Sequence, residues 1–278
     1  MTPTTRLLPL VGAAFASIAT SHFAFAGQSS SDGKVSKEPV VMEQYEAGRG
    51  LITLEGPSGM FINPTSATLP KGAYTFQYCI FFPNTDSETI GNGVMTSYGV
   101  TDWLEVGAIG NYINANRDSL NEREFGLGGP LVRVRLLKNE GWIPQVSIGA
   151  YGKYGTNILG QTTAFLAAYE RFAISDTGFL RSIGFHAGVR ASWFHEDAAE
   201  SNSVDGYFGG EFQLPARLYV VGEIATQGKS PTGNLKRLPY AFGLQWRLKA
   251  VNLSVAMIQN GSENELGLYS GVGLGFKF

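Results

Sequence analysis

The sequence predicts an all-β protein, a transmembrane antiparallel up-and-down β-barrel of about twelve strands, and three observations lead to this fold class. After Gly72, segments of about ten residues alternate apolar side chains with small or polar ones. Turn-forming residues separate these segments. Glycine is abundant, at 36 residues, and aromatic residues reach 12%. A period of two indicates strands with one apolar face, and its repetition without any long apolar run is typical of membrane-spanning barrels.

The first 26 residues have the pattern of a secretory signal peptide. Arg6 gives the start a positive charge, residues 7–20 form an apolar run, and residues 24–26 (AFA) fit the small-x-small cleavage pattern. A membrane-anchoring helix is the alternative, but the run is shorter than the roughly 20 residues that a bilayer requires. The sequence contains a single cysteine, Cys79, which excludes an internal disulfide framework.

Residues 27–71 are expected to form a periplasmic N-terminal arm and a turn-rich segment. Residues 27–50 are polar and aperiodic, as in mobile arms. The stretch LEGPSGMFINPTSATLPKG, residues 54–72, is dense in Gly, Pro, Asn and Ser and predicts ordered turns. The barrel is expected to occupy residues 72–278.

The apolar residues of each later segment define an outward face. The connections between segments alternate between short, as in TD at 101–102, and long, as in NANRDSLNERE and HEDAAESNS. Outer-membrane barrels have short periplasmic turns and longer external loops, so both termini are expected in the periplasm. Only the connection at 173–182 is longer than this rule predicts. Strands are clear near 74–82, 104–108, 132–136, 146–150, 185–193, 218–224, 240–248, 251–257 and 272–278, and less clear near 92–100, 160–172 and 204–214.

Four tryptophans fall near the predicted strand ends. The indole ring prefers the headgroup zone of a bilayer, so these residues predict an aromatic girdle. Core residues of a β-sandwich are the alternative interpretation. The four are Trp103, Trp142, Trp193 and Trp246.

The chain ends in mid-strand, on the alternating sequence GVGLGFKF. Closing the sheet into a barrel would pair this strand with the first one and remove the exposed edge. Its apolar residues, above all Phe276 and Phe278, resemble the C-terminal signature of Gram-negative outer-membrane proteins. That resemblance implies recognition by the barrel assembly machinery of the outer membrane.

A second resemblance involves the region before and around the first strand. GPSGMFINPTSATLPKG, followed by YTFQY and YGVTDWLEVG, is similar to the opening of a family of outer-membrane barrels associated with exopolysaccharide production. The similarity covers roughly residues 55–107. It implies an accessory role in polysaccharide export.

The candidate functional residues are those that parity places on the inward face. Charges inside a barrel must be hydrated or paired, so they predict either a narrow polar channel or a salt-bridged plug. A barrel of about twelve strands lies between small filled barrels and open pores, which leaves both possibilities. The expected lumen-lining residues are Glu105, Arg133, Arg135, Lys153, Glu170, His186, Arg190, Glu211, Glu223 and Arg247.

The sequence offers no recognisable catalytic site. After the leader it has two histidines, His186 and His195, and neither lies in a nucleophile motif. Cys79 has inward parity and is expected to be a small buried hydrophobe. The glycine patterns are followed by no predicted helix that could bind phosphate, and the acidic residues at 196–200 are expected to be solvated. We therefore expect neither enzyme activity nor a cofactor or metal.

These observations favour a passive channel or envelope transport component in the cell outer membrane. One alternative is a plugged structural or accessory barrel linked to polysaccharide export or envelope assembly, and another is a soluble secreted β-sandwich that binds a ligand. Lys+Arg and Asp+Glu number 21 and 23, so no basic stripe is available for nucleic acid. The expected partners are outer-membrane lipid, lipopolysaccharide and the barrel assembly machinery.

Overall fold

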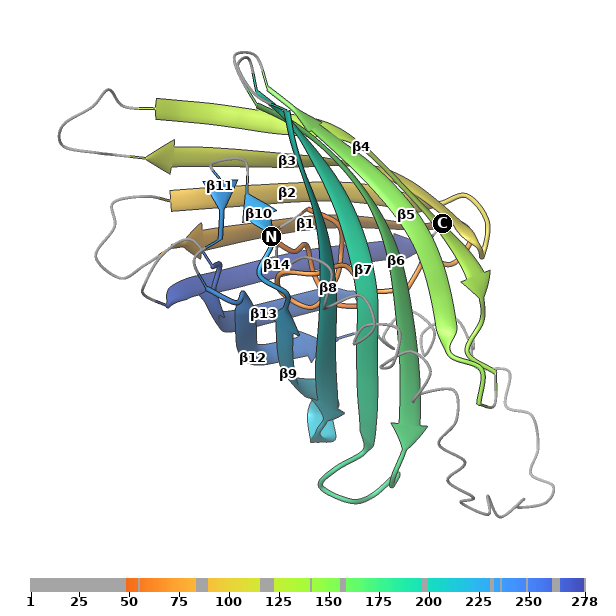
Figure 1. Cartoon of the computed structure of the whole chain (residues 1–278). Coiled ribbons are helices and arrows are strands. Elements are labelled where there is room, and N and C mark those ends of the chain that lie inside the picture. Colours follow the sequence, from red (N-terminus) through yellow and green to blue (C-terminus); the bar gives the residue numbers. More distant parts are fainter. Residues whose placement is uncertain are drawn as a thin grey trace, which may run out of the picture. The chain divides into compact units, whose positions relative to one another are not determined.

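The structure is a computed structural model that describes residues 49–277 except 55, 84–89, 116–122, 141, 156–158, 197–199, 231–232, 236, 249 and 262–265. In this part of the chain, twelve antiparallel strands form a closed barrel (Figure 1). Each strand pairs with its neighbours along the chain, and β1 closes the barrel against β14. The predicted twelve-strand up-and-down barrel is confirmed.

Two short strands, β10 and β11, form a separate sheet in the connection between β9 and β12. The helix η2, Pro215–Arg217, is a single 3₁₀ turn. No helix among the described residues is long and apolar enough to cross a membrane. The strands are β1 Ala73–Phe82, β2 Ile90–Gly99, β3 Leu104–Ala115, β4 Arg123–Leu137, β5 Gln145–Tyr154, β6 Leu159–Ala173, β7 Ser182–Glu196, β8 Glu200–Gln213, β9 Leu218–Ala225, β10 Lys229–Ser230, β11 Gly233–Asn234, β12 Tyr240–Arg247, β13 Val251–Gln259 and β14 Gly267–Lys277.

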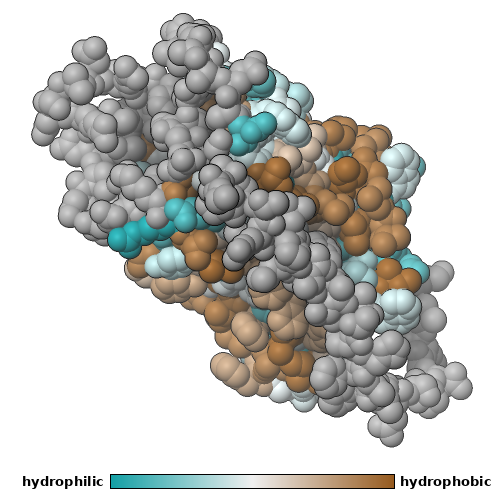
Figure 2. Space-filling view, viewed as in Figure 1, coloured by the Kyte–Doolittle hydropathy of each residue, from teal (hydrophilic) through white to brown (hydrophobic). Residues whose placement is uncertain are grey.

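The wall exposes apolar side chains and buries polar ones. In β1, Phe76 and Tyr78 are 42% and 40% exposed, whereas Gln77 between them is 1% exposed. Strand β12 follows the same rule, with Leu244 outside and Gln245 inside. Figure 2 shows apolar residues gathered over much of the face in view. This inverted pattern fits a wall that faces lipid, and a soluble sandwich would instead bury its apolar faces between two sheets.

The connections differ from the predicted alternation of short and long. The stretch HEDAAESNS was expected as a long loop, but β7 continues to Glu196 and β8 begins at Glu200. Similarly, β3 continues to Ala115 and β4 begins at Arg123. These strands continue through polar sequence, because the apolar alternation that marks a lipid-facing strand is not required outside the bilayer. The apolar alternation in the sequence therefore marks the ends of the apolar wall, whereas the hydrogen-bonded strands extend further.

Residues 49–70, which we call the plug, lie inside the barrel (orange in Figure 1). Isolated bridges within the plug join Ile52 to Ser58 and Gly59 to Pro64. The sequence predicted ordered turns for most of this stretch but did not place them inside the barrel, and residues 27–48 of the predicted arm lie outside the described residues. The physical reason for the position inside the barrel is that the plug carries apolar side chains that would be exposed on an arm, and they pack against inward-facing residues of the wall. The plug members of this buried cluster are Ile52, Met60, Phe61 and Ile62.

Candidate functional site

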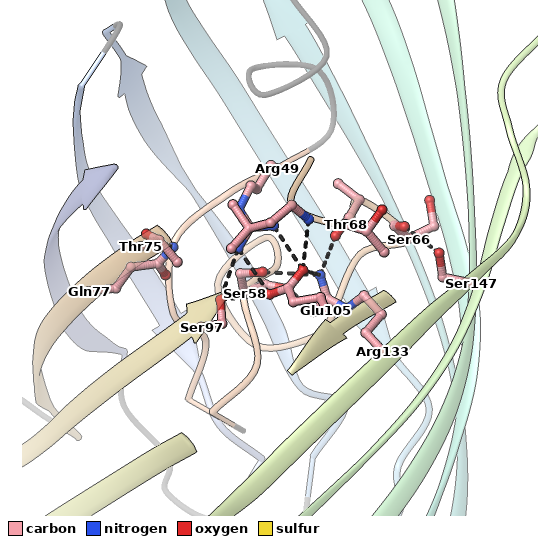
Figure 3. A network of polar contacts seen from close by, with 12 residues as sticks. Arg49, Ser58, Ser66, Thr68, Thr75, Gln77, Ser97, Glu105, Arg133 and Ser147 are labelled. Atoms are coloured by element: carbon pink, nitrogen blue, oxygen red, sulfur yellow. Dashed lines mark hydrogen bonds and ion pairs between the residues drawn. The ribbon is translucent and has the colours of Figure 1, made fainter. Parts of the chain in front are cut away.

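The candidate site is the polar contact between the plug and the inner wall, and it begins at Glu105 of β3. We call the end of the barrel where β1 begins the proximal end, and Glu105 lies near it. Arg49 donates to both carboxylate oxygens, with Nη1–Oε2 and Nη2–Oε1 distances of 3.0 and 3.1 Å (Figure 3). The backbone N–H of Leu69 donates to Oε2 at 2.9 Å, and Ser97 Oγ donates to Oε1 at 2.8 Å. One buried carboxylate therefore holds both ends of the plug.

Arg133 of β4 lies beside this carboxylate and binds the middle of the plug. Its Nη1 is 3.9 Å from Glu105 Oε2 and donates to Ser58 Oγ at 3.1 Å. The guanidinium also donates to the backbone carbonyl of Ser58 at 3.0 Å and to that of Ala67. Arg49, Arg133 and Glu105 are all buried, so two cations share one anion in a nearly dry environment. Such a cluster is stable only while every member remains paired.

Glu223 of β9 binds the plug at the other side of the barrel. The backbone N–H groups of Phe61 and Ile62 each donate to Oε1 at 2.6 Å. Asn63 donates to Oε2 through its backbone N–H at 3.1 Å and its side-chain Nδ2 at 2.8 Å. Successive N–H groups that point at one anion form a strong, charge-assisted contact. Gln245 Nε2 adds a hydrogen bond to the carbonyl of Met60 at 2.8 Å.

A third group of inward side chains belongs to the wall itself. Glu211 of β8 accepts hydrogen bonds from Arg247 Nη2 and Tyr169 Oη, both at 2.7 Å. His186 Nε2 lies 3.4 Å from the same carboxylate, and the imidazole stacks on Tyr169. Arg247 also donates from Nε to Gln245 Oε1 at 3.0 Å, which connects this group to the plug through Gln245.

Solved structures with the same architecture are known, although no family model and no curated protein match the chain. The chain is similar to an outer-membrane channel from Pseudomonas putida F1, with 12% identity, a TM-score of 0.54, and coverage of 75% of this chain and 97% of that one. It is also similar to the KdgM porin in complex with disordered oligogalacturonate, with 9% identity, a TM-score of 0.48, and coverage of 73% and 99%. The fold is that of an outer-membrane channel.

The remaining predicted lumen residues lie in three different places. Lys153 and Arg190 are buried on the inner wall away from the proximal end, where Arg190 Nε is 3.6 Å from Asp205 Oδ2. Arg135 is half-buried at the proximal end. Glu170 departs from the expectation, because its cross-strand partner is the outward-facing Phe185, which gives Glu170 outward parity, although its side chain is buried at 9% exposure. The sequence of β6 carries apolar or small residues on both faces, which hid its parity.

Sequence reasoning missed several residues of the site. Arg49 was assigned to the arm, and no periodicity in that stretch marks it as a wall contact. Tyr169 and Arg171 have inward parity in β6, whereas the sequence prediction had placed their neighbour Glu170 on the inward face. Asp205 could have been found, because it alternates with the exposed Val204 in β8.

The tryptophans of this outer-membrane-type barrel are all exposed and lie close to strand ends. Trp103, Trp142 and Trp246 lie toward the proximal end, and Trp193 lies toward the opposite one. Trp246 Nε1 donates to the carbonyl of Ala216 in the neighbouring turn at 2.8 Å. The aromatic girdle remains a prediction that this placement accommodates.

The remaining candidate residues lie at the chain end, in β1 and in the loops. Phe276 is exposed on the outer face of β14, whereas Phe278 lies outside the described residues. Cys79 is buried. Within the described ranges, no group of three or more His, Cys, Asp or Glu side chains is arranged to hold a metal ion. Asp197 of the acidic stretch is not among the described residues.

Proposed function

We propose that the protein is a passive channel of the cell outer membrane for small polar solutes, and that the plug closes it. The observation that carries this proposal is the way in which the plug is attached. Arg49 and Leu69, near the two ends of the plug, bind the same carboxylate near the proximal end. Among the residues that the structure describes, the plug forms no strand pairing with the barrel wall. It can therefore leave the barrel as a loop, without threading an end and without opening the barrel.

The inner wall is suited to water once the plug is displaced. Twelve strands give a wider interior than the small barrels that side chains alone can fill. Glu105, Arg133, Glu223 and Gln245 would then face the lumen, where water could hydrate them.

A second function is favoured by the apolar contacts of the plug. Ile52, Met60, Phe61 and Ile62 belong to one buried cluster with inward wall residues such as Tyr269. A plug held by such a cluster could remain in place permanently, which would make the protein a structural or accessory barrel. Conductance separates the two functions.

We also propose an orientation and a set of partners. The short connections at 100–103, 214–217 and 248–250 lie at the proximal end together with longer ones at 138–144 and 174–181, whereas the longest connection, 226–239, lies at the opposite end. Short turns are periplasmic in outer-membrane barrels, so both termini would face the periplasm. The partners would be lipid and lipopolysaccharide on the apolar wall, and the assembly machinery at the C-terminal strand.

A reversible covalent lock tests whether the plug closes the channel. Cys79 on β1 is the single cysteine of the chain, and it lies close to Ile52 of the plug. A Cβ atom added at Gly93 would lie 2.8 Å from Cys79 Sγ and 3.1 Å from Ile52 Cδ1, so both side chains approach the same point. An Ile52→Cys variant would put a second thiol on the side of the plug that approaches Cys79, and loss of both free thiols on oxidation is the test that a disulfide has formed.

The measurement is current through planar bilayers that contain the purified protein. Wild type and the reduced Ile52→Cys variant should show channel openings, and oxidation of the variant should abolish them until a reductant is added. The double variant Ile52→Cys, Cys79→Ser controls for oxidation elsewhere. Absence of openings in wild type and in the reduced variant would establish the permanently filled barrel. Openings that persist in the oxidised variant would show that ions bypass the plug.

A further inference from the structure

A cleft of about 480 Å³ opens at the proximal end, between the last residues of the plug and the wall. Residues 67, 68 and 70 of the plug form one side, and residues of β4, β5 and β6 form the other. Its volume falls in the range of small-molecule sites, which is about 300 to 1,000 Å³. The charged residues that line it are Asp102, Arg135, Lys138, Arg171 and Asp176.

The two arginines of the cleft form no direct ion pair with a described acid, although the carboxylate of Asp102 lies near enough to Arg135 to attract its charge. Arg135 makes no side-chain hydrogen bond to any residue that the structure describes. Arg171 donates from Nε to Ser182 Oγ at 3.1 Å and from Nη2 to Gln213 Oε1 at 2.8 Å, and both partners are uncharged. Within the described part of the chain, neither arginine forms an ion pair. Two partly buried guanidinium groups therefore line one cleft without a direct ion pair among the described residues, and Asp102 partly offsets the charge of Arg135.

The other polar groups of the cleft suit hydroxyl groups. Asp102 Oδ1 accepts a hydrogen bond from the backbone N–H of Lys71 at 3.0 Å, and the carboxylate also attracts the charge of Arg135. Asp176 lies in the exposed connection after β6, and Asn139 supplies an amide. Carboxylates accept hydrogen bonds from hydroxyl groups but repel a second anion, so they favour the uncharged part of a ligand.

We infer that this cleft binds a small hydroxylated carboxylate, a hydroxy acid or a sugar acid. Arg135 and Arg171 hold its carboxylate, because a guanidinium matches a carboxylate with two parallel N–H donors. Asp102, Asp176 and Asn139 accept or donate hydrogen bonds at its hydroxyl groups. The inference rests on the proposed channel function, for which it names the solute class. Displacing the plug would remove one side of the cleft and open it to the interior.

The test is isothermal titration calorimetry on the purified full-length barrel in detergent, with gluconate as the probe. Acetate carries the carboxylate alone and glucose carries the hydroxyl groups alone. Gluconate should show saturable binding at least tenfold tighter than either. Arg135→Gln should weaken gluconate binding by tenfold or more, and Arg171→Gln should do the same. Lys277→Gln removes a positive charge from β14, outside the cleft, and should leave the affinity unchanged.

Each outcome decides the inference separately from the channel function. Gluconate that binds no tighter than acetate and glucose, or that binds equally to wild type and Arg135→Gln, would overturn it. Arg135 makes no hydrogen bond that its loss would break, so this variant should fold, and heat-dependent migration on a gel would verify a closed barrel. Binding without conductance would overturn the channel function and leave the cleft assignment standing. Conductance without gluconate binding would do the reverse.

Discussion

Arg49 and Glu105, 56 positions apart in the chain, form a buried bidentate ion pair that fastens the start of the plug to β3. Leu69 near the end of the plug uses the same carboxylate, and Arg133 lies next to it. The structure therefore concentrates the attachment of the plug on one anionic side chain. Removing that charge should be more damaging than removing any exposed carboxylate.

The first prediction concerns Glu105→Gln. The substitution leaves Arg49 and Arg133 buried without their anion, and breaking a buried pair in this way costs about 3 to 5 kcal/mol. The free energy of unfolding, measured by urea titration in detergent, should fall by about this amount. The matched control is Glu140→Gln, whose partner Lys138 is exposed and should contribute only about 0 to 1 kcal/mol. Equal losses in the two variants would refute the role assigned to Glu105.

The second prediction concerns Glu223→Gln on the other side of the plug. Glutamine has the same shape, but it replaces one acceptor oxygen with a donor that faces the N–H groups of residues 61–63. Leaving buried donors unpaired costs about 1 to 3 kcal/mol, so these amides should exchange with deuterium roughly tenfold faster or more. Hydrogen exchange followed by mass spectrometry measures this. Glu170→Gln makes the same chemical change at a position of outward parity in β6, away from the plug, and should leave the exchange of residues 61–63 unaltered.

The third prediction tests which face of the wall meets lipid. Val255 lies in the middle of β13 and is exposed, whereas Val251 begins the strand beside a turn on the same face. An arginine at mid-bilayer costs about 2 to 4 kcal/mol and one near the interface about 0 to 1 kcal/mol. Val255→Arg should therefore lower folding stability in lipid vesicles much more than Val251→Arg. Similar effects would show that this face does not meet the bilayer.

The fourth prediction concerns the end of the chain. Phe276 lies on the outer face of the strand that closes the barrel, and the terminal phenylalanines resemble an assembly signature. Deleting Phe278 should reduce the amount of folded barrel recovered from the outer membrane and increase degradation. Lys277→Ala should leave recovery close to wild type. Quantitative blotting of membrane fractions measures both, and equal recovery would remove the terminal residue from the assembly signal.

The wall could be predicted from the sequence because its two faces meet different surroundings. In β1 or β12 the outward face is apolar and the inward face is small or polar, so a period of two is visible. Strand β6 shows the limit of this reasoning, because Phe165 and Tyr169 face inward while Leu166 faces outward. With large apolar residues on both faces, parity cannot be read, and Glu170 was placed on the wrong face for this reason.

The plug could not be predicted because it has no repeating pattern. Its contacts with Glu105 and Glu223 are made largely by backbone N–H groups, which every residue possesses. One signal was present, the apolar triplet at 60–62, which would be unfavourable on a solvated arm. Inward charges such as Arg133 were predicted from the alternation of the wall strands. Their partners lie in the plug, which has no such alternation, so they could not be predicted in the same way.

The contact between Tyr269 and the plug has a consequence for the order of folding. Tyr269 lies on the last strand and donates to the carbonyl of Ile52, 217 positions earlier. Further along the same seam, Thr75 Oγ1 of the first strand donates to Leu274 O of the last, 199 positions later. Joining such distant segments is entropically costly and slow. The plug continues directly into β1, the strand that pairs with β14. A plug already bound inside the barrel therefore offers β14 a surface that is connected to its pairing strand. We expect the plug to guide the pairing of β14 with β1 that closes the barrel.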